Sequence, residues 1–477
     1  MAGLEAFEQS SISTPAWGAW ARNGCFWLLI AMLAWSPFPL GSNREWSWSI
    51  LTIWVAICWL FWAVWSWAIP ETQRRNLGRL RIPLALAGLA LVWALSQAVP
   101  TVPLNWAHPV WGEASSLLKR PVEGTISLNP WRTISEATKL ATYLAVAWIA
   151  FSLCRNADRA RQLLNAIIIT GAAYAIYAFI LGIFRTDQYS LFYFPPTQDQ
   201  FIAGPFVLHN SFADFEGLSA IAALARLVEL ANGKIVASKG FRRWTTSALG
   251  FAFGSASWIV VATILTISAL VASASRAGAF STLCALIVMA LPFVSRLKHR
   301  ASRRWALAGA GSVVTLLLVL VWISGDTLTD RLEDLIDAGN ADPIRIALWS
   351  AAQRMITSAP FLGLGLGTFQ DAYPMYATQM LPYIMDKAHS DYLEFSAGVG
   401  LPAAFCWWGA FLWAMVLMAR GYFNRSRERI YPLVGLGASI LVAVHSAVDF
   451  SLQIPAVAVT YAAILGLGLA QSYSTKN

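Results

Sequence analysis

The run SWSILTIWVAICWLFWAVWSWAI at residues 47–69 contains no charged side chain and is long enough to cross a lipid bilayer as one helix. Similar runs recur along the whole chain. Hydrophobic residues make up 57% of the sequence and charged residues only 12%, whereas soluble domains carry about 25% charged residues. A helix satisfies its own backbone polar groups in lipid. The sequence therefore predicts an all-α polytopic membrane protein.

Runs of about 18 or more mainly apolar residues are the usual signal of a membrane-crossing helix, and we expect about twelve of them. They cover residues 25–40, 47–69, 82–99, 137–154, 163–184, 213–231, 250–273, 277–295, 305–323, 393–419, 431–447 and 454–471. The sixth run is the least regular, because it contains four charged residues, Asp214, Glu216, Arg226 and Glu229. We expect residues 1–477 to form a single transmembrane domain, with a large loop at 324–388 that carries short helices.

Lysine and arginine are concentrated in alternate connections between the apolar runs. These connections lie within residues 71–81, 154–162, 232–244, 296–305 and 419–429. Because short cytoplasmic loops carry the excess of Lys and Arg, we expect these connections and both termini in the cytoplasm, and the 324–388 loop in the periplasm. The formal charge of +9 then reflects topology and contact with anionic lipid headgroups. We do not expect nucleic acid as a partner. We also expect no removable signal peptide.

The cysteines and the charged pair of the sixth run bear on metal binding. All five cysteines lie within apolar runs, so we expect packing residues rather than a disulfide framework or a zinc site. Asp214-Phe-Glu216 has the acid-x-acid form that can hold a divalent cation against phosphates. However, it begins the sixth run rather than lying in the first outer loop. We therefore expect no metal ion and no other cofactor.

Ionisable residues gather at the expected periplasmic side. Arg276 lies at a turn between two apolar runs, Arg345 and Arg354 flank a short amphipathic stretch, and Lys387 lies beside His389. Ionisable groups at a membrane boundary are costly unless they are paired or used. A positive pocket at this level suits an anionic ligand such as a lipid-linked phosphate or pyrophosphate.

Several motifs occur on the same side and in order. They are GPFVLHNSFADF at 204–215, SRAG at 275–278, Arg345 and Trp349 followed by PFLGLGLGTF at 360–369, HSDYLE at 389–394, and HSAVDFSLQIP at 445–455. Together they resemble the O-antigen ligase and polymerase superfamily of bacterial membrane glycosyltransferases. The motif-bearing region covers about residues 200–460, and the first half is similar only in hydropathy and topology.

The resemblance implies a membrane-embedded glycosyltransferase of the C-type architecture in the bacterial inner membrane, working at the periplasmic face without a metal ion. Its donor would be a glycan on undecaprenyl pyrophosphate. Its acceptor would be a sugar hydroxyl on a growing glycan or on lipid A–core, and a protein acceptor is the least expected. Other partners would be membrane lipids and envelope polysaccharide-assembly proteins.

Arg276 and Arg345 match the two functional arginines of the superfamily, and we expect them to bind the donor pyrophosphate. Cleavage of a glycosyl–pyrophosphate bond develops negative charge on the leaving group, which fixed positive groups stabilise. Arginine offers planar, bidentate donors that stay charged. The alternative is that each is an interfacial arginine whose side chain reaches lipid headgroups.

His389 is the candidate general base, because imidazole can take a proton from an acceptor hydroxyl as it attacks. Asp391 or Glu394 would hold the ring in one tautomer, and a local turn favours Asp391. The alternative is a polar helix start in which Ser390 is the N-cap.

Further residues are expected around this site. His445 and Asp449 are four apart, and on one helix they would share a face and hydrogen-bond to each other in support of the site. Arg354, His209 and Asn210 are candidates for contact with sugar or phosphate.

Two alternative interpretations are considered: that the protein is a transporter, and that its glycine-rich segment is a nucleotide-binding loop. A lipid-linked glycan flippase or transporter should show internal repeats and ionisable residues near the bilayer midplane, and neither is evident. The GLGLG segment at 363–367 does not follow a predicted strand, which argues against a nucleotide-binding loop. We expect it to be a flexible turn that closes over the donor.

Overall fold

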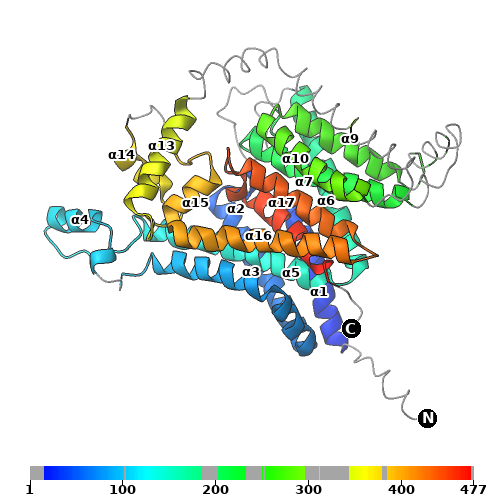
Figure 1. Ribbon diagram of the computed structural model, residues 1–477, viewed down its shortest axis with the longest axis horizontal. Coiled ribbons are helices and arrows are strands. Elements are labelled where there is room, and N and C mark those ends of the chain that lie inside the picture. Colours follow the sequence, from blue (N-terminus) through cyan, green and yellow to red (C-terminus); the bar gives the residue numbers. More distant parts are fainter. Residues whose placement is uncertain are drawn as a thin grey trace, which may run out of the picture.

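In the computed structural model the protein is a bundle of helices (Figure 1). The structure describes residues 15–100, 104–184, 202–232, 246, 250, 253–254, 256–295, 311, 343–378 and 384–473. No strand occurs among these residues. The predicted all-helical class is therefore confirmed for the described part of the chain.

The first half of the chain forms mainly long helices. They are α1 (Ala16–Trp35), α2 (Glu45–Trp67), α3 (Pro70–Ser96), α4 (Val110–Leu118), α5 (Pro130–Leu153) and α6 (Ala157–Phe184), with two short 3-10 helices at Leu40–Ser42 and Leu104–Trp106.

The second half contains both long and short helices. They are α7 (His209–Asn232), α9 (Ser257–Ala272), α10 (Arg276–Ser295), α13 (Pro343–Ser358), α14 (Phe369–Tyr376), α15 (Asp391–Val399), α16 (Leu401–Asn424), α17 (Ile430–His445) and α18 (Pro455–Ala470), with the 3-10 helix η3 at Ser451–Gln453.

Many of these helices have the composition of membrane spans. Within the described residues, four segments are long and apolar enough to cross a bilayer: Glu45–Trp67, Arg74–Ser96, Ala157–Ile183 and Leu401–Asn424. Helices α9, α10, α17 and α18 are also apolar but shorter. The chain is thus a polytopic membrane protein, while the expected number of twelve spans stays a prediction. The ninth expected run, 305–323, lies outside the described residues apart from Gly311.

The tenth expected run, 393–419, is not one helix but two. Helix α15 ends at Val399 and α16 begins at Leu401, because Gly400 between them has a φ of 79°. This left-handed backbone suits glycine. A β-carbon at Gly400 would also lie 2.4 Å from the carbonyl oxygen of Phe361. The break makes α15 a separate short helix that can carry polar residues at its start.

Helix α18 is the centre of the bundle. All of its residues are buried, and it packs against α5 and α17. Other parts of the protein therefore enclose this helix on every side, and none of its faces is turned toward lipid. The residues just before α18 are therefore fixed by a rigid element.

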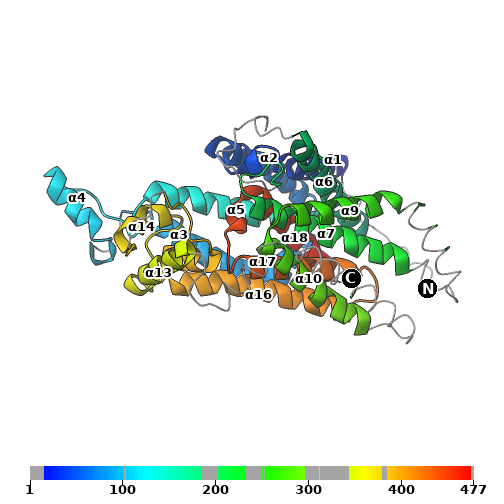
Figure 2. The same cartoon turned by 90° about the horizontal axis from the view of Figure 1, so that it is seen from above.

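Three basic connections meet at one end of the bundle, as expected from the alternation of Lys and Arg. The side chains of Arg155 and Arg425 donate to the carbonyl oxygen of Tyr473 at 3.2 and 3.0 Å, and the Tyr473 hydroxyl donates to the carbonyl oxygen of Arg79 at 3.0 Å. We call this the basic end. Helices α13, α14 and α15 lie at the opposite end, which we call the site end, and α4 projects beyond them (Figures 1 and 2). Which side of the membrane each end faces stays a prediction.

The GLGLG segment at 363–367 is held in place by backbone hydrogen bonds. The Leu364 and Gly365 amides donate to the carbonyl oxygens of Ala397 and Gly398 at 3.0 and 2.9 Å. A β-carbon at Gly365, whose φ is 107°, would lie 2.3 Å from the Ser127 hydroxyl. The segment is therefore tightly packed against the end of α15, in contrast to the closing turn expected from the sequence.

Candidate functional site

His389 lies in the segment that leads into α15. Its φ of 51° is in the left-handed region, which costs a non-glycine residue about 1–3 kcal/mol and persists only where the surroundings impose it. Ser390 is the N-cap of α15, and its hydroxyl accepts from the Leu393 amide at 3.5 Å. Ser390 therefore caps the helix as expected, and His389 stands just outside it.

Glu394 fixes the segment before His389. One carboxylate oxygen accepts from the Ala388 amide at 2.7 Å, and the other lies 3.5 Å from the ammonium group of Lys387. Burial disfavours the charged form of Lys387, but the nearby carboxylates of Glu394 and Glu136 raise its pKa above the ordinary value. Glu394 thus positions the backbone of His389 rather than its ring.

The His389 ring is paired with Asp449. Its Nδ1 atom lies 3.2 Å from Asp449 Oδ1, and the two side chains are 32% and 3% exposed. The side-chain amide of Asn210 donates to Asp449 Oδ2 at 2.6 Å, and the Phe450 amide donates to Oδ1 at 2.9 Å. Burial opposes ionisation of Asp449, but the hydrogen bond from His389 and the charge of His445 lower its pKa below the ordinary value. An ionised Asp449 requires Nδ1–H on His389, which leaves Nε2 to accept a proton.

The structure does not pair His445 with Asp449 as expected. Helix α17 ends at His445, and the Asp449 amide still donates to the His445 carbonyl oxygen at 3.0 Å, but the two side chains have different partners. The His445 Nδ1 atom lies instead 2.9 Å from Asp214 Oδ2, and both side chains are 1% exposed. Asp449 is thereby left to face His389 and Asn210.

The hydrogen-bond partners of the Asp391 carboxylate are Ser446 and Gln453, not His389. Its carboxylate accepts from the Ser446 hydroxyl at 2.8 Å and from the Gln453 side-chain amide at 3.0 Å. Its backbone amide donates to the Ser446 carbonyl oxygen at 2.9 Å. Burial raises the pKa of Asp391 to about 7, although the bonds from Ser446 and Gln453 oppose the rise. Asp391 therefore ties the start of α15 to the segment between α17 and α18.

Helix α13 is anchored to the same segment. The Trp349 indole donates to the carbonyl oxygen of His389 at 3.2 Å. Arg345 lies four residues before Trp349 on α13, so the two share a face. Arg354, at about 100° per residue, falls on the opposite face, and its Nε donates to the Tyr376 carbonyl oxygen at 2.7 Å. Arg345 therefore lies on the face of α13 that carries Trp349, whereas Arg354 joins α13 to α14.

The start of α7 connects the Arg276 turn with Asp449. The His209 Nδ1 atom lies 2.9 Å from the carbonyl oxygen of Ser273, in the turn between α9 and α10. Arg276 is the exposed first residue of α10, and Asn210 bonds to Asp449. Polar contacts through the start of α7 thus link the turn that precedes Arg276 with Asp449, the partner of His389.

Asp214 and Glu216 lie inside the bundle. They are 1% and 0% exposed, and neither carboxylate oxygen of Glu216 has a hydrogen-bond partner among the described residues. Within that part of the chain, no group of three or more His, Cys, Asp or Glu side chains could hold a metal ion.

All five cysteines are free, and three of them, Cys25, Cys58 and Cys154, are buried. This agrees with the packing role expected for them.

Part of the chain matches the sequence model of a known family. Residues 261–408 match the sequence model of the O-antigen ligase family. The matched segment runs from α9 into α16 and includes Arg276, Arg345 and His389. The match confirms the resemblance to the O-antigen ligase and polymerase superfamily, and it supports a function of that type in polysaccharide biosynthesis. Among curated proteins, none matches the chain significantly.

Proposed function

We propose that the protein transfers a glycan from undecaprenyl pyrophosphate to a sugar hydroxyl at the periplasmic face of the inner membrane. The observation that carries the proposal is the pairing of His389 with a buried Asp449 at 3.2 Å, within a chain that matches the O-antigen ligase family. An aspartate on one imidazole nitrogen fixes the tautomer and leaves the other nitrogen as a base. That is the arrangement needed to activate a hydroxyl.

The proposed reaction is a single displacement. The acceptor oxygen forms a bond to the anomeric carbon of the donor glycan, and the bond from that carbon to the pyrophosphate oxygen breaks. The hydroxyl proton moves to Nε2 of His389, whose Nδ1–H stays bonded to Asp449. Undecaprenyl pyrophosphate leaves as the anion.

Arg276 and Arg345 are proposed to bind the donor pyrophosphate and stabilise the charge that develops on it. They come from the start of α10 and the first turn of α13. Contacts through His209, Asn210 and Asp449 relate the turn before α10 to His389, and the Trp349 indole relates α13 to the backbone of His389. Guanidinium groups suit pyrophosphate because they donate two parallel hydrogen bonds. Asn210 and Glu394 are proposed to position the base, and Arg354 to hold α13 on α14.

The test of this function uses purified protein in detergent micelles with a lipid-linked glycan donor and a glycan acceptor. Glycosyl transfer predicts a longer product and release of undecaprenyl pyrophosphate. A flippase or transporter cannot form product in micelles, which have no two compartments, so absence of product would contradict the proposal.

The acceptor is tested in cells that lack the gene. Loss of all capped lipid A–core identifies a ligase, whereas capping with single repeats or loss of secreted polymer identifies a polymerase. We favour polymerisation of repeat units. Complementation with the wild-type gene, but not with His389→Ala, should restore the missing product.

A further inference from the structure

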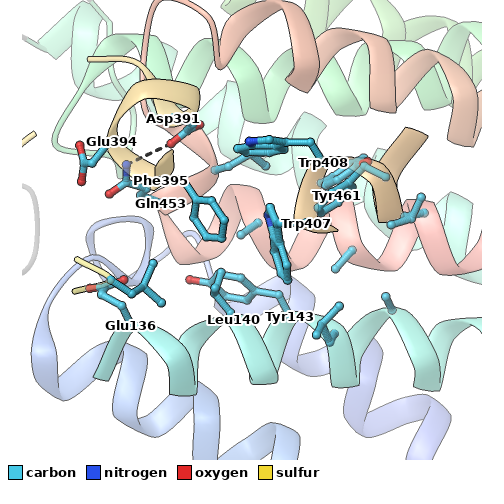
Figure 3. Close-up of a pocket in the computed structure, with 18 of the residues that line it drawn as sticks. Glu136, Leu140, Tyr143, Asp391, Glu394, Phe395, Trp407, Trp408, Gln453 and Tyr461 are labelled. Atoms are coloured by element: carbon cyan, nitrogen blue, oxygen red, sulfur yellow. Dashed lines mark hydrogen bonds between the residues drawn. The ribbon is translucent and has the colours of Figure 1, made fainter. Parts of the chain in front are cut away.

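A cavity of about 110 Å³ lies between α5, α16 and α18, and Asp391 and Gln453 are among the residues that line it. Figure 3 shows its two ends. Glu136, Glu394 and Gln453 gather at one end, whereas the rings of Trp407 and Tyr461 lie toward the other. The cavity is thus polar at the site end and aromatic within the bundle.

The length of the cavity matches one leaflet of a membrane. Along α5 its lining runs from Glu136 to Ala147, which is about 16 Å at 1.5 Å per residue. Half of a hydrocarbon core is about 15 Å. A hydrocarbon chain that enters from the polar end therefore has the length of a leaflet available to it.

Two buried hydrogen-bond donors lining the cavity have no partner among the described residues. They are the Tyr143 hydroxyl on α5 and the Trp408 indole nitrogen on α16. By contrast, the hydroxyl of Tyr461 on α18 donates to the Ser439 hydroxyl at 3.0 Å. Buried donors in native proteins are nearly always paired. Tyr143 and Trp408 therefore indicate a ligand that carries acceptor oxygens, which a pure hydrocarbon lacks.

The charges at the polar end argue against a pyrophosphate head. The carboxyl groups of Glu136, Asp391 and Glu394 line this end. Lys139 and Lys387 pair with Glu136 and Glu394 at 2.7 and 3.5 Å. These two ammonium groups are already paired with carboxylates, and burial raises the pKa of Asp391 to about 7. The ammonium groups therefore leave no positive charge for a multiply charged anion, and the end suits a head group without net charge.

We propose that this cavity binds one acyl chain of a zwitterionic glycerolipid of the phosphatidylethanolamine class. The chain lies among the aromatic rings, an ester carbonyl accepts from Tyr143 or Trp408, and the ammonium group faces the carboxyl groups at the polar end. The site is distinct from the donor site proposed above and does not depend on glycosyl transfer. Lipid occupancy would brace α15, which carries Asp391 and Glu394 and follows His389.

The experiment places the protein in lipid nanodiscs that contain phosphatidylethanolamine with a photoactivatable group in one acyl chain. Illumination should attach the probe to peptides that include residues 140–147 and 407–411. A second sample contains a photoactivatable polyprenyl pyrophosphate, which should not label these peptides. Labelling by the polyprenyl probe instead, or labelling by neither, would overturn the proposal.

Two tyrosine variants on opposite walls of the cavity make a matched pair. Tyr143→Phe removes the unpaired hydroxyl and keeps the ring, and it should lower labelling by phosphatidylethanolamine about 3-fold or more, as expected for one lost hydrogen bond. Tyr461→Phe removes a hydroxyl that is already bonded to Ser439, so it should lower thermal stability and leave labelling unchanged. Equal labelling of wild type and Tyr143→Phe would contradict the proposal, as would an equal loss in both variants.

Discussion

The Nδ1 atom of His389 lies 3.2 Å from Oδ1 of Asp449, although the two residues are 60 positions apart in the chain. Asp449 stands in the short segment between α17 and the buried helix α18, and His389 stands just before α15. Asn210 at the start of α7 holds the other carboxylate oxygen at 2.6 Å. Three separate segments thus converge to orient one imidazole, and the following predictions test what that orientation does.

Substitution Asp449→Asn should slow glycosyl transfer by about 100-fold or more, because a carboxamide can favour the wrong tautomer of His389. Donor affinity should change little. The measurement is the single-turnover rate with purified donor and acceptor. Asp391→Asn is the matched control, since Asp391 is equally buried but bonds to Ser446 and Gln453. Equal losses in the two variants would mean that the cluster acts only through the fold.

The arginines are predicted to divide into two groups. Arg276→Ala and Arg345→Ala should each weaken donor binding and cost about 100-fold or more in turnover, by analogy with a lost oxyanion donor. Lysine at either position should rescue poorly, because a point charge cannot replace a bidentate fork. Arg354→Ala should lower the melting temperature with little effect on donor affinity. If Arg354→Ala weakens donor binding as much as the other two substitutions, the assignment of Arg345 and Arg354 to different roles on opposite faces of α13 is wrong.

The stability of the protein should fall between about pH 4 and pH 7 because of Asp391. Its pKa is raised from 3.8 to about 7 in the folded state. Over this range the folded protein holds a proton that the unfolded chain has released, so raising the pH favours unfolding. The contribution of Asp391 is fully present below its unfolded pKa and is lost as the pH rises through 7. Thermal unfolding from pH 4 to 8 should show a shallower slope in Asp391→Asn, and an unchanged slope would contradict the assignment.

Glycosyl transfer should survive treatment with EDTA, because the proposed charge stabilisation comes from arginines. The measurement is turnover of purified protein before and after chelation. Loss of turnover that Mg²⁺ or Mn²⁺ restores would refute this account and bring Asp214 and Glu216 into the mechanism.

The site end should face the periplasm. In a cysteine-free background, Thr357→Cys at the end of α13 should react with a membrane-impermeant thiol reagent added from the periplasm. Ser426→Cys, in the basic connection between α16 and α17, should not react. Both positions are exposed. The reverse pattern would invert the proposed orientation.

The helical runs could be predicted from the sequence because apolar length alone requires a helix in lipid. The separation of α15 from α16 was not evident, since the break depends on how Gly400 meets the carbonyl oxygen of Phe361, a contact between distant parts of the chain. Hydropathy treats the two helices as one run.

The site residues could be predicted by type but not by partner. A four-residue spacing permits a side-chain pair but does not select it. His445 pairs instead with Asp214 of α7, which packs against α17. The exchange of partners among His445, Asp214, Asp449 and His389 therefore depends on contacts between helices distant in the sequence, which local spacing does not reveal.

The most direct test of the central claim compares donor affinity with single-turnover transfer rate in wild type and His389→Ala. Removal of a group that acts on the attacking hydroxyl should lower the transfer rate by about 100-fold or more and leave donor affinity within a few-fold of wild type, because the group acts in the transition state. A wild-type transfer rate in His389→Ala, or a loss of donor binding as complete as in the Arg276 and Arg345 variants, would contradict the role of His389 as the general base.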